Sequence, residues 1–432
     1  MNDLLYARWQ MGTSLAFHIV FAAIGVAMPA LMAIAEWRWL RSRDPLDLEL
    51  ARRWAKGTAI LFAVGAVSGT VLSFELGLLW PRFMEFSGAI IGMPFALEGF
   101  AFFTEAIFLG IYLYGWDKIS ARLHFGAGLV VALSGAASAF FVVLANAWMN
   151  SPGGFELVDG RAVSVEPWVA MFSPGWAHEA IHVVLSCYLA TGFAIAGIHA
   201  GLLLRSPQSA FHKRALAITL SVGGAAALLM PISGDLSARQ VAEYQPSKLA
   251  AMEAQFETMR GAPLRIGGWP DPEREVVIGA IEIPRGLSLL AYHDPDAVVR
   301  GLKEWPKDEW PPARWVHVCF QIMVGLGSLL AALALTGALL AWRNREVPRA
   351  RWYLAAVALA GPLGFVAMEA GWLVTELGRQ PWIIRGVMRT HEAVTPHGHL
   401  WIPFWTFTLL YLFLAAVVVM LLRRQILTER SP

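Results

Sequence analysis

The sequence has little charge and almost no cysteine. Charged residues make up 15% of the 432 positions and apolar residues 57%, whereas soluble domains hold about 25% and roughly 45–50%. The two cysteines, Cys187 and Cys319, show neither a zinc-binding spacing nor a disulfide framework, so we interpret them as packing residues. The net charge of +2 gives no indication of nucleic-acid binding. A chain this poor in charge must place much of its surface against something other than water.

Nucleotide-binding motifs are absent as well. The sequence has no Walker A loop, no dinucleotide-binding fingerprint and no internal repeat, so nothing in it indicates nucleotide-driven transport. The first apolar run has no basic stretch before it and no small-residue cleavage site after it. This pattern predicts a helix that is retained and not a signal peptide.

Long apolar runs are what the sequence does have. A helix needs about 20 residues to cross about 30 Å of hydrocarbon. The sequence therefore predicts an all-α integral membrane protein with about nine transmembrane helices. The runs are 11–35, 58–80, 93–114, 125–149, 176–204, 215–233, 315–342, 352–374 and 400–422.

The connections between the runs differ in charge and length. Most Lys and Arg residues of the short connections fall in one alternate set, so the positive-inside rule predicts a periplasmic N-terminus and a cytoplasmic C-terminus. We expect helices one to six in 1–233, a periplasmic loop in 234–314 and helices seven to nine in 315–432. A loop of about 80 residues is often functional. Within it, 248–259 has the pattern of an amphipathic helix near the membrane surface.

Several ionisable side chains fall inside the apolar runs at a common depth. Such groups cost at least a few kcal/mol each in a membrane, and each is a functional hypothesis by default. With a rise of 1.5 Å per residue, these side chains lie about 8–12 Å below the predicted outer surface. Scattered structural residues would not favour one leaflet, so the common level predicts a shared cofactor cluster. Its members are His18, Glu75, Glu98, His182 and, with a thioether, Met323.

Histidine, methionine and carboxylate are haem ligands in many proteins. His182 and Met323 could bind the two faces of one haem and form a six-coordinate site for electron transfer. His18 and Glu376 would each suit a five-coordinate haem with an open face. Glu98 and Glu105 are seven residues apart, which places them on one helix face about 10 Å from each other. That spacing fits a proton relay, and a pair of buried protonated acids is the alternative.

One segment carries a specific resemblance. Residues 371–382, GWLVTELGRQPW, resemble the GRQPW signature of cytochrome bd oxidase subunit I. Residues 97–105 resemble the glutamate pair of that family, and 145–149 resemble the end of its fourth helix. The similarity runs through all nine predicted helices.

The resemblance implies a set of haem ligands and working residues. His182 and Met323 would ligate a low-spin haem b558, while His18 and Glu376 would ligate the high-spin haems b595 and d in an order that stays open. The remaining positions implied by the family are proton carriers at Glu98 and Glu105, residues close to the haems at Trp372 and Arg379, an oxygen path at Ser138, and quinol oxidation at Lys248 and Glu253 of the loop, called the Q-loop.

The chain departs from the family at one position. Gln321 stands two residues before Met323, where the family commonly has Arg. We expect the loss of that charge to alter the potential of the low-spin haem. The departure resembles the cyanide-insensitive branch, in which the third haem is b-type, so this haem is expected to be either d or b. The Q-loop is of the short kind.

The resemblance implies a quinol:oxygen oxidoreductase. It would be the catalytic subunit of a terminal oxidase in the bacterial inner (cytoplasmic) membrane, reducing dioxygen to water and building a proton gradient without pumping. Its expected partners are oxidase subunit II, a small single-helix subunit and membrane lipid. Two alternatives stay open, a haem-free proton- or cation-coupled secondary transporter and a haem-bearing anchor for a separate dehydrogenase.

Overall fold

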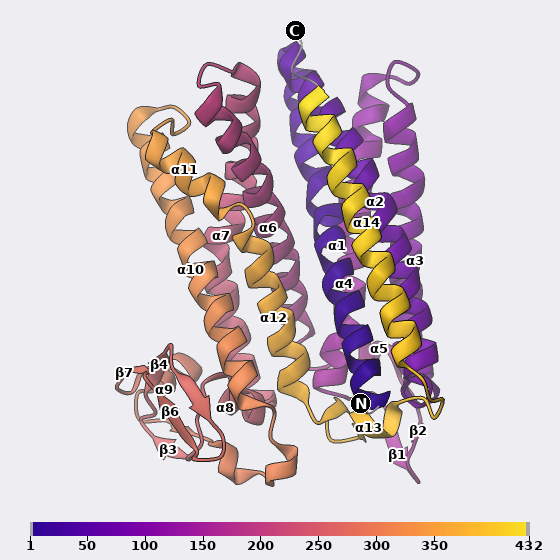
Figure 1. The fold of residues 1–432 in the computed structure, drawn as a ribbon, viewed down its shortest axis with the longest axis vertical. Helices are drawn as coiled ribbons and strands as arrows, with labels where there is room; N and C mark the ends of the chain where they lie inside the picture. The colour runs from indigo at the N-terminus through magenta and orange to yellow at the C-terminus, as the bar shows by residue number, and fades with distance from the viewer. Residues whose placement is uncertain (1–2, 429–432) are drawn as a thin grey trace.

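The computed structural model describes residues 3–428 (Figure 1). Within that part of the chain, nine helical segments are long and apolar enough to cross a membrane. The prediction of an all-α chain with about nine such helices is confirmed. They are α1 (Asp3–Ser42), α2 (Pro45–Leu79), α3 (Pro81–Tyr114), α4 (Ala121–Asn150), α6 (Trp176–Arg205), α7 (Ala210–Tyr244), α10 (Ala313–Asn344), α11 (Arg351–Ala360) together with α12 (Leu363–Arg379), and α14 (Trp401–Thr428).

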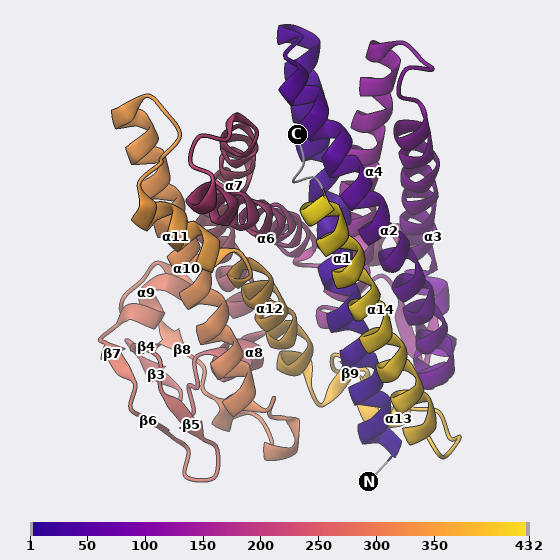
Figure 2. The same ribbon diagram turned by 45° about the horizontal axis from the view of Figure 1, so that its top comes forward.

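The long helices form two groups that stand side by side. Helices α1 to α4 and α14 make one group, and α6, α7, α10, α11 and α12 make the other (Figures 1 and 2). An apolar cluster that includes Ala23, Val26, Cys187 and Met368 joins the groups at their interface. We call the end that carries residues 245–312 the loop end, and the opposite end, which carries the α1–α2 connection and Arg214, the basic end.

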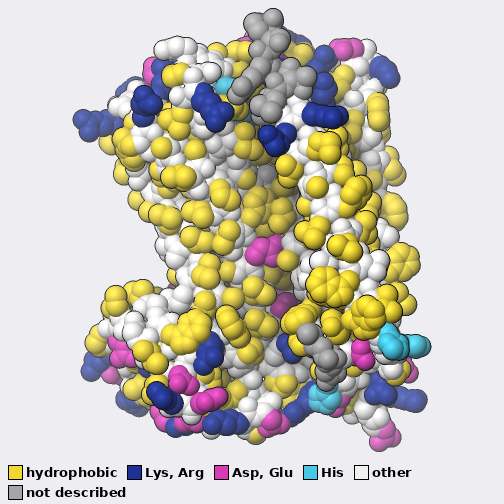
Figure 3. All heavy atoms as spheres, viewed as in Figure 1, with side chains coloured by type: hydrophobic (Ala, Val, Ile, Leu, Met, Phe, Trp, Pro, Cys, Tyr) yellow, Lys and Arg dark blue, Asp and Glu magenta, His cyan; other side chains and the backbone are white. Residues whose placement is uncertain are grey.

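Side chains of opposite character separate along the long axis. Apolar side chains cover the middle of the molecule, while Lys, Arg, Asp and Glu gather at both ends (Figure 3). A band of apolar surface about as tall as the hydrocarbon layer is what a membrane-spanning bundle requires.

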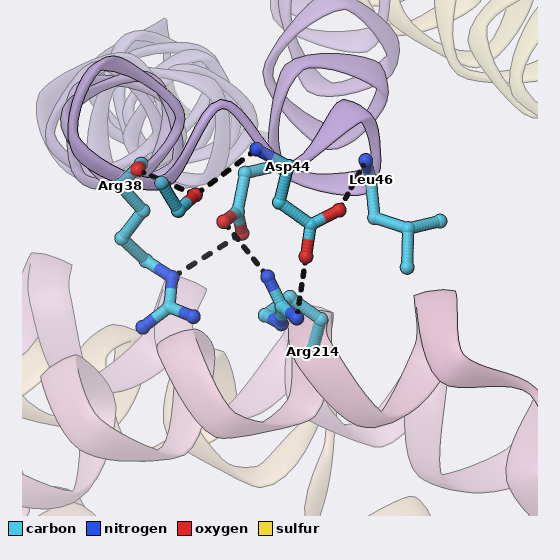
Figure 4. Close-up of polar contacts among 6 residues, drawn as sticks. Arg38, Asp44, Leu46 and Arg214 are labelled. Atoms are coloured by element: carbon cyan, nitrogen blue, oxygen red, sulfur yellow. Dashed lines mark hydrogen bonds and ion pairs between the residues drawn. The ribbon is translucent and has the colours of Figure 1, made fainter.

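An ion-pair cluster at the basic end ties the two groups together. Asp44 caps α2, because its Oδ1 accepts a hydrogen bond from the Leu46 amide at 3.0 Å. Its other oxygen accepts from Arg214 of α7 at 2.9 Å (Figure 4). The fully buried carboxylate of Asp47 accepts from Arg214 at 2.7 Å and from Arg38 of α1 at 3.2 Å. A buried charge needs such partners, so these contacts fix α7 against the α1–α2 connection.

The eighth span is broken in its middle. Pro362 follows α11 and has no amide hydrogen to continue the helix, and α12 begins at Leu363. The neighbouring Gly361 lies so close to α6 that a Cβ at Gly197 would come within 2.9 Å of the Gly361 Cα atom. The break therefore lets α11 and α12 follow the two halves of α6 separately.

The insertion at the loop end is shorter than its charge pattern predicts, because it begins later, after Tyr244, and ends slightly earlier, before Ala313. Helix α7 continues to Tyr244, past residue 234, because its last turns remain helical where the sequence is already polar. The predicted helix over 248–259 is only α8 (Pro246–Met252). It ends early because Ala254 has a φ of 48° and the Gln255 amide turns back to the Ala250 carbonyl. Contrary to the prediction of a surface helix, Lys248 to Met252 are all buried.

The rest of the insertion consists of short elements. Its strands pair as antiparallel two-stranded ribbons, β3 with β8, β4 with β7 and β5 with β6. These strands are β3 (Met259–Arg260), β4 (Leu264–Ile266), β5 (Trp269–Asp271), β6 (Val276–Ile278), β7 (Ile281–Ile283) and β8 (Val298–Val299), with α9 (Gly286–Tyr292) and 3-10 turns at Leu302–Glu304 and Lys307–Glu309. The other small elements of the loop end are β1 (Glu156–Val158), β2 (Arg161–Val163), α5 (Pro167–Met171), β9 (Trp382–Ile384), β10 (Met388–Arg389) and α13 (Thr390–Ala393).

Candidate functional site

His18 of α1 is held in the form that can bind a metal. Its Nδ1 lies 3.0 Å from the Ser68 hydroxyl of α2. That hydroxyl donates its own hydrogen to the backbone carbonyls of Val64 and Gly65 at 3.0 and 3.1 Å. Ser68 therefore accepts from His18 Nδ1, and Nε2 is left with its lone pair. A metal-binding histidine is commonly oriented by a hydrogen bond of this kind on its second nitrogen.

His182 of α6 repeats the arrangement on the other helix group. Its Nδ1 lies 3.1 Å from the hydroxyl of Ser233 on α7. The same pairing of imidazole with a serine of the next helix thus occurs twice. In both cases the serine contact is made by Nδ1, and Nε2 is the nitrogen that could bind a haem iron.

Met323 lies across the second helix group from His182. Helices α6 and α10 each pack against α7 and α12 and do not pack extensively on each other, so the two side chains come from opposite helices of a four-helix arrangement. The Met323 sulfur lies against α12 at Gly371, where a Cβ would come within 2.9 Å of Sδ. Trp372, the next residue, packs against the apolar cluster between the groups.

Glu376 of α12 is part of a polar network. Its Oε1 accepts from the Asn146 amide of α4 at 2.6 Å, and its Oε2 accepts from Arg379 at 2.6 Å. The Arg379 side chain is 3% exposed, yet its Nε and its second terminal nitrogen have no hydrogen-bond partner among the described residues. A buried guanidinium in this state suits an anionic group such as a haem propionate.

The network continues to the insertion at the loop end. Asn150 donates to the Asn146 carbonyl and side-chain oxygens at 3.0 and 2.9 Å, and Lys248 of α8 donates to Asn150 Oδ1 at 2.6 Å. The Lys248 chain lies against α12 at Gly378, where a Cβ would come within 2.7 Å of the Lys248 Cγ atom. Lys248, Asn150, Asn146, Glu376 and Arg379 are therefore one connected set of side chains. The sequence offered no signal for Asn150, because its partner becomes apparent only when α4 and α8 meet.

Lys248 and Glu253 are both buried but face different partners. Burial lowers the pKa of Lys248 to about 7, against the opposing effect of the Glu179 carboxylate. Burial raises the pKa of Glu253 to about 8 despite the nearby Arg265 guanidinium. Glu253 Oε2 has no hydrogen-bond partner. Lys248 points towards α4 and α12 and Glu253 lies beside Arg265, so the structure shows no direct contact between them.

Gln321 contacts the insertion at the loop end with both ends of its amide. Its Nε2 donates to the Arg265 carbonyl at 2.9 Å, and its Oε1 accepts from the Gly267 amide at 2.9 Å. One turn earlier on α10, the fully buried His317 places its ring nitrogens 2.7 Å from the Met252 carbonyl and 3.0 Å from the Gly267 carbonyl. His317 was not among the predicted residues. Both side chains anchor the loop to α10.

The predicted relay acids lie between α1, α3 and α4. Ser138 of α4 donates to Glu98 Oε1 at 3.2 Å. Glu105 is 5% exposed, and its Oε1 lies 3.2 Å from the position of a Cβ at Gly135 and 3.9 Å from one at Gly25. Gly135 of α4 thus makes room for this carboxyl group, and Gly25 of α1 lies at ordinary contact distance from it.

Glu75 belongs to a separate polar group near His18. Its Oε1 accepts from Gln10 at 3.0 Å and from Ser14 at 2.9 Å, and Tyr411 of α14 donates to Ser14 at 3.0 Å. Gln10, Ser14 and Tyr411 were missed, since single polar residues in apolar runs gave no indication of which helix they face.

Comparison with known proteins agrees with this arrangement. The family model for cytochrome bd terminal oxidase subunit I matches residues 6–430. The chain is 39% identical over 428 residues to the "Putative cytochrome bd menaquinol oxidase subunit I" of Bacillus subtilis (strain 168), covering 98% of this chain and 96% of the relative. It is 32% identical over 443 residues to the cytochrome bd ubiquinol oxidase subunit 1 of the same organism, covering 99% and 94%.

A solved structure gives the same result. The bd oxidase from Geobacillus thermodenitrificans matches with a TM-score of 0.93 and 40% sequence identity, over 100% of this chain and 99% of that chain. The resemblance carried by residues 371–382 is confirmed. With its sequence matched along nearly its whole length and its fold matched by a solved relative, the chain belongs to the cytochrome bd terminal oxidase subunit I family.

Proposed function

We propose that this chain is the haem-carrying catalytic subunit of a quinol oxidase, which couples the oxidation of two quinols to the reduction of one dioxygen to two waters. Family membership along residues 6–430 is the observation that carries the proposal. The haem-free transporter has no support from these comparisons. The two Bacillus relatives are named for different quinols, so the proposal extends to quinols as a class.

The side chains present fit three haems. His182 and Met323 would hold a low-spin haem b558, and His18 and Glu376 would hold the high-spin haem b595 and a third haem of type d or b. When bound, these groups supply electron transfer from quinol and the iron at which oxygen is reduced. Arg379 supports this assignment with two buried nitrogens that lack partners, and Trp372 with its place between the helix groups.

Lys248 and Glu253 are proposed to take the protons of quinol at the Q-loop. Each quinol releases two electrons and two protons. A lysine with a pKa of about 7 is partly neutral near neutral pH, so its Nζ can accept a proton. Glu253 can accept a second proton at the unpartnered Oε2 once it ionises. Gln321 and His317 would hold the loop over this site.

Glu105 and Glu98 are proposed to carry the protons used to form water. The proposed orientation puts the loop end in the periplasm and the basic end in the cytoplasm of a bacterial inner membrane. Proton release at the loop end and uptake from the basic end then build a gradient without a pumping step. Ser138 would lie on the oxygen path beside Glu98. Oxidase subunit II and a small single-helix subunit are the proposed partners.

Visible spectroscopy of the purified oxidase tests the ligand assignment. We expect Met323→Leu to abolish the reduced band of the low-spin haem, because leucine offers no sulfur to the iron. The matched control is Met368→Leu, which replaces a methionine of the apolar cluster between the helix groups. A normal low-spin band in Met323→Leu would refute this ligand. A protein with no Soret band and no haem by the pyridine haemochrome assay would refute the oxidase as a whole.

A further inference from the structure

The basic end contains a buried acid–histidine pair that the proposed reaction has not used. His124 lies in the first turn of α4, and its Nδ1 is 2.8 Å from Glu36 Oε1 of α1. Its Nε2 is 2.8 Å from the Tyr112 carbonyl, which can only accept, so Nε2 carries a hydrogen. Nδ1 and Oε1 therefore share one proton. Glu36 is 0% exposed and His124 is 3% exposed.

Two polar atoms of this cluster face each other without a formed hydrogen bond. The Tyr112 hydroxyl lies next to the Glu36 carboxylate. Neither that hydroxyl nor Glu36 Oε2 meets the geometry of a hydrogen bond with any described residue, although both residues are completely buried. Buried polar groups are nearly always paired with protein or with water. The hydroxyl and the carboxylate face each other directly, so a small rotation would bring them into hydrogen-bond geometry and connect them for proton transfer.

Tyr112 stands in line with the relay acids. It follows Glu105 on α3 by seven residues, as Glu105 follows Glu98. The three side chains therefore share one helix face, with about 10 Å between neighbours along the axis. Helical side chains lean towards the N-terminus, which for α3 is the loop end, so the Tyr112 hydroxyl leans towards Glu105.

Helix α4 packs against this face of α3 through small residues. A Cβ at Gly128 would come within 2.8 Å of the Tyr112 ring, and one at Gly135 within 3.2 Å of Glu105 Oε1. Ser138 then donates to Glu98. Helix α4 therefore contacts the α3 face at each of the three positions, and His124 lies at the basic end of this contact.

We propose that Glu36, His124 and Tyr112 form the entrance through which protons reach Glu105 and Glu98. This inference rests on the proposed function. A proton from water at the basic end binds Glu36 Oε2, while His124 and Glu36 keep their shared proton. Tyr112 passes its hydroxyl proton towards Glu105 through water and takes the proton from Glu36. One proton enters and one leaves, so no charge stays behind.

Proton uptake by the complete oxidase in proteoliposomes tests the proposal. A pH-indicating dye at the basic end follows uptake after an oxygen pulse. Tyr112→Phe removes only the hydroxyl that faces Glu36 and keeps the ring. Because a positioned proton carrier commonly contributes two or more powers of ten to its step, we expect uptake to slow by about tenfold or more. Haem content and spectra should stay unchanged.

Further variants separate this role from a structural one. Glu36→Gln should slow uptake like Tyr112→Phe, and Glu36→Asp should restore part of the rate because it keeps a carboxyl group. Asp117→Asn is the control, since Asp117 is an exposed carboxylate at the same end whose partner is Arg52 and not a member of this set. We expect this control to keep the normal uptake rate.

The outcomes distinguish the entrance from the relay. Normal uptake in Tyr112→Phe and Glu36→Gln, with slow uptake in Glu105→Gln, would overturn the entrance and leave the relay intact. Normal uptake in Glu105→Gln would overturn the relay of the proposed function. If Glu36→Gln fails to assemble, Tyr112→Phe alone decides.

Discussion

Replacing Gly371 by alanine should remove the Met323 sulfur from haem binding. The new Cβ would lie 2.9 Å from Met323 Sδ. Non-bonded heavy atoms pack at about 3.5–4.0 Å, so the overlap is roughly 0.6–1.1 Å. Met323 is a flexible side chain and would move, because the backbones of α10 and α12 are held by their own packing. A metal–ligand bond holds only within about 0.2 Å, so a shift of this size breaks it.

The loss of the sulfur should change the haem and leave the fold nearly intact. We expect a five-coordinate, high-spin haem at this position that binds carbon monoxide and has a lower potential, since methionine ligation raises the potential. Overpacking of this kind costs about 1–3 kcal/mol, less where one side chain can give way. Reduced-minus-oxidised and carbon monoxide difference spectra would measure the change, with haem content from the pyridine haemochrome assay.

A close control is available on α10 itself. A Cβ at Gly325, two residues after Met323, would meet no atom within 4 Å. Gly325→Ala should therefore keep the normal low-spin spectrum. If Gly371→Ala also keeps that spectrum and binds no additional carbon monoxide, Met323 is not the ligand, or its sulfur does not lie against Gly371 in the loaded enzyme.

Three further predictions concern protons and the Q-loop. Glu105→Gln and Glu98→Gln should lower quinol oxidase turnover by about tenfold or more, because an amide cannot pass a proton. Ser138→Ala removes one hydrogen bond to Glu98 and should have a smaller effect. Wild-type turnover in the glutamine variants would contradict the relay. Turnover should rise with pH between about 6 and 8, because burial lowers the pKa of Lys248 to about 7 and raises the pKa of Glu253 to about 8. Both groups therefore lose their protons and become proton acceptors in this range. A pH profile of Lys248→Met that still shows the step near pH 7 would rule out Lys248 as its source. Gln321→Leu removes two hydrogen bonds to the loop backbone, worth about 1 kcal/mol each. The variant should have a several-fold higher KM for quinol and faster proteolysis of residues 245–312. An unchanged KM would show that the contact of Gln321 with the loop is dispensable.

Hydropathy and charge predict the spans well and their ends poorly. The first apolar run is 11–35, but α1 extends from Asp3 to Ser42, because hydropathy detects the part in hydrocarbon and helices continue beyond it. Short ribbons such as β4 with β7 carry two or three residues each, too few for a periodic pattern. The early end of α8 depends on the left-handed backbone at Ala254, an alanine that gives no such warning.

The candidate site was predictable only where the residue type itself is informative. Imidazole and carboxyl groups in apolar runs stand out because they are costly there, which applies to His18, His182 and Glu105. Met323 does not stand out, since methionine is common in packed interiors, and family resemblance supplied it. Asn150 and His317 act through partners that lie far away in the sequence, and only the packed structure shows them.

The contacts between Arg214 and its two aspartates constrain how this end of the chain can vary. Asp47 has no exposed surface and two arginines from different helices. A neutral residue in place of Arg214 would leave that carboxylate undercompensated in the interior, at a cost of about 3–5 kcal/mol. Replacement of both members by apolar residues of similar volume would avoid this cost. In related chains we therefore expect substitutions of the arginine and the aspartate to occur together, so that both residues are kept or both are replaced.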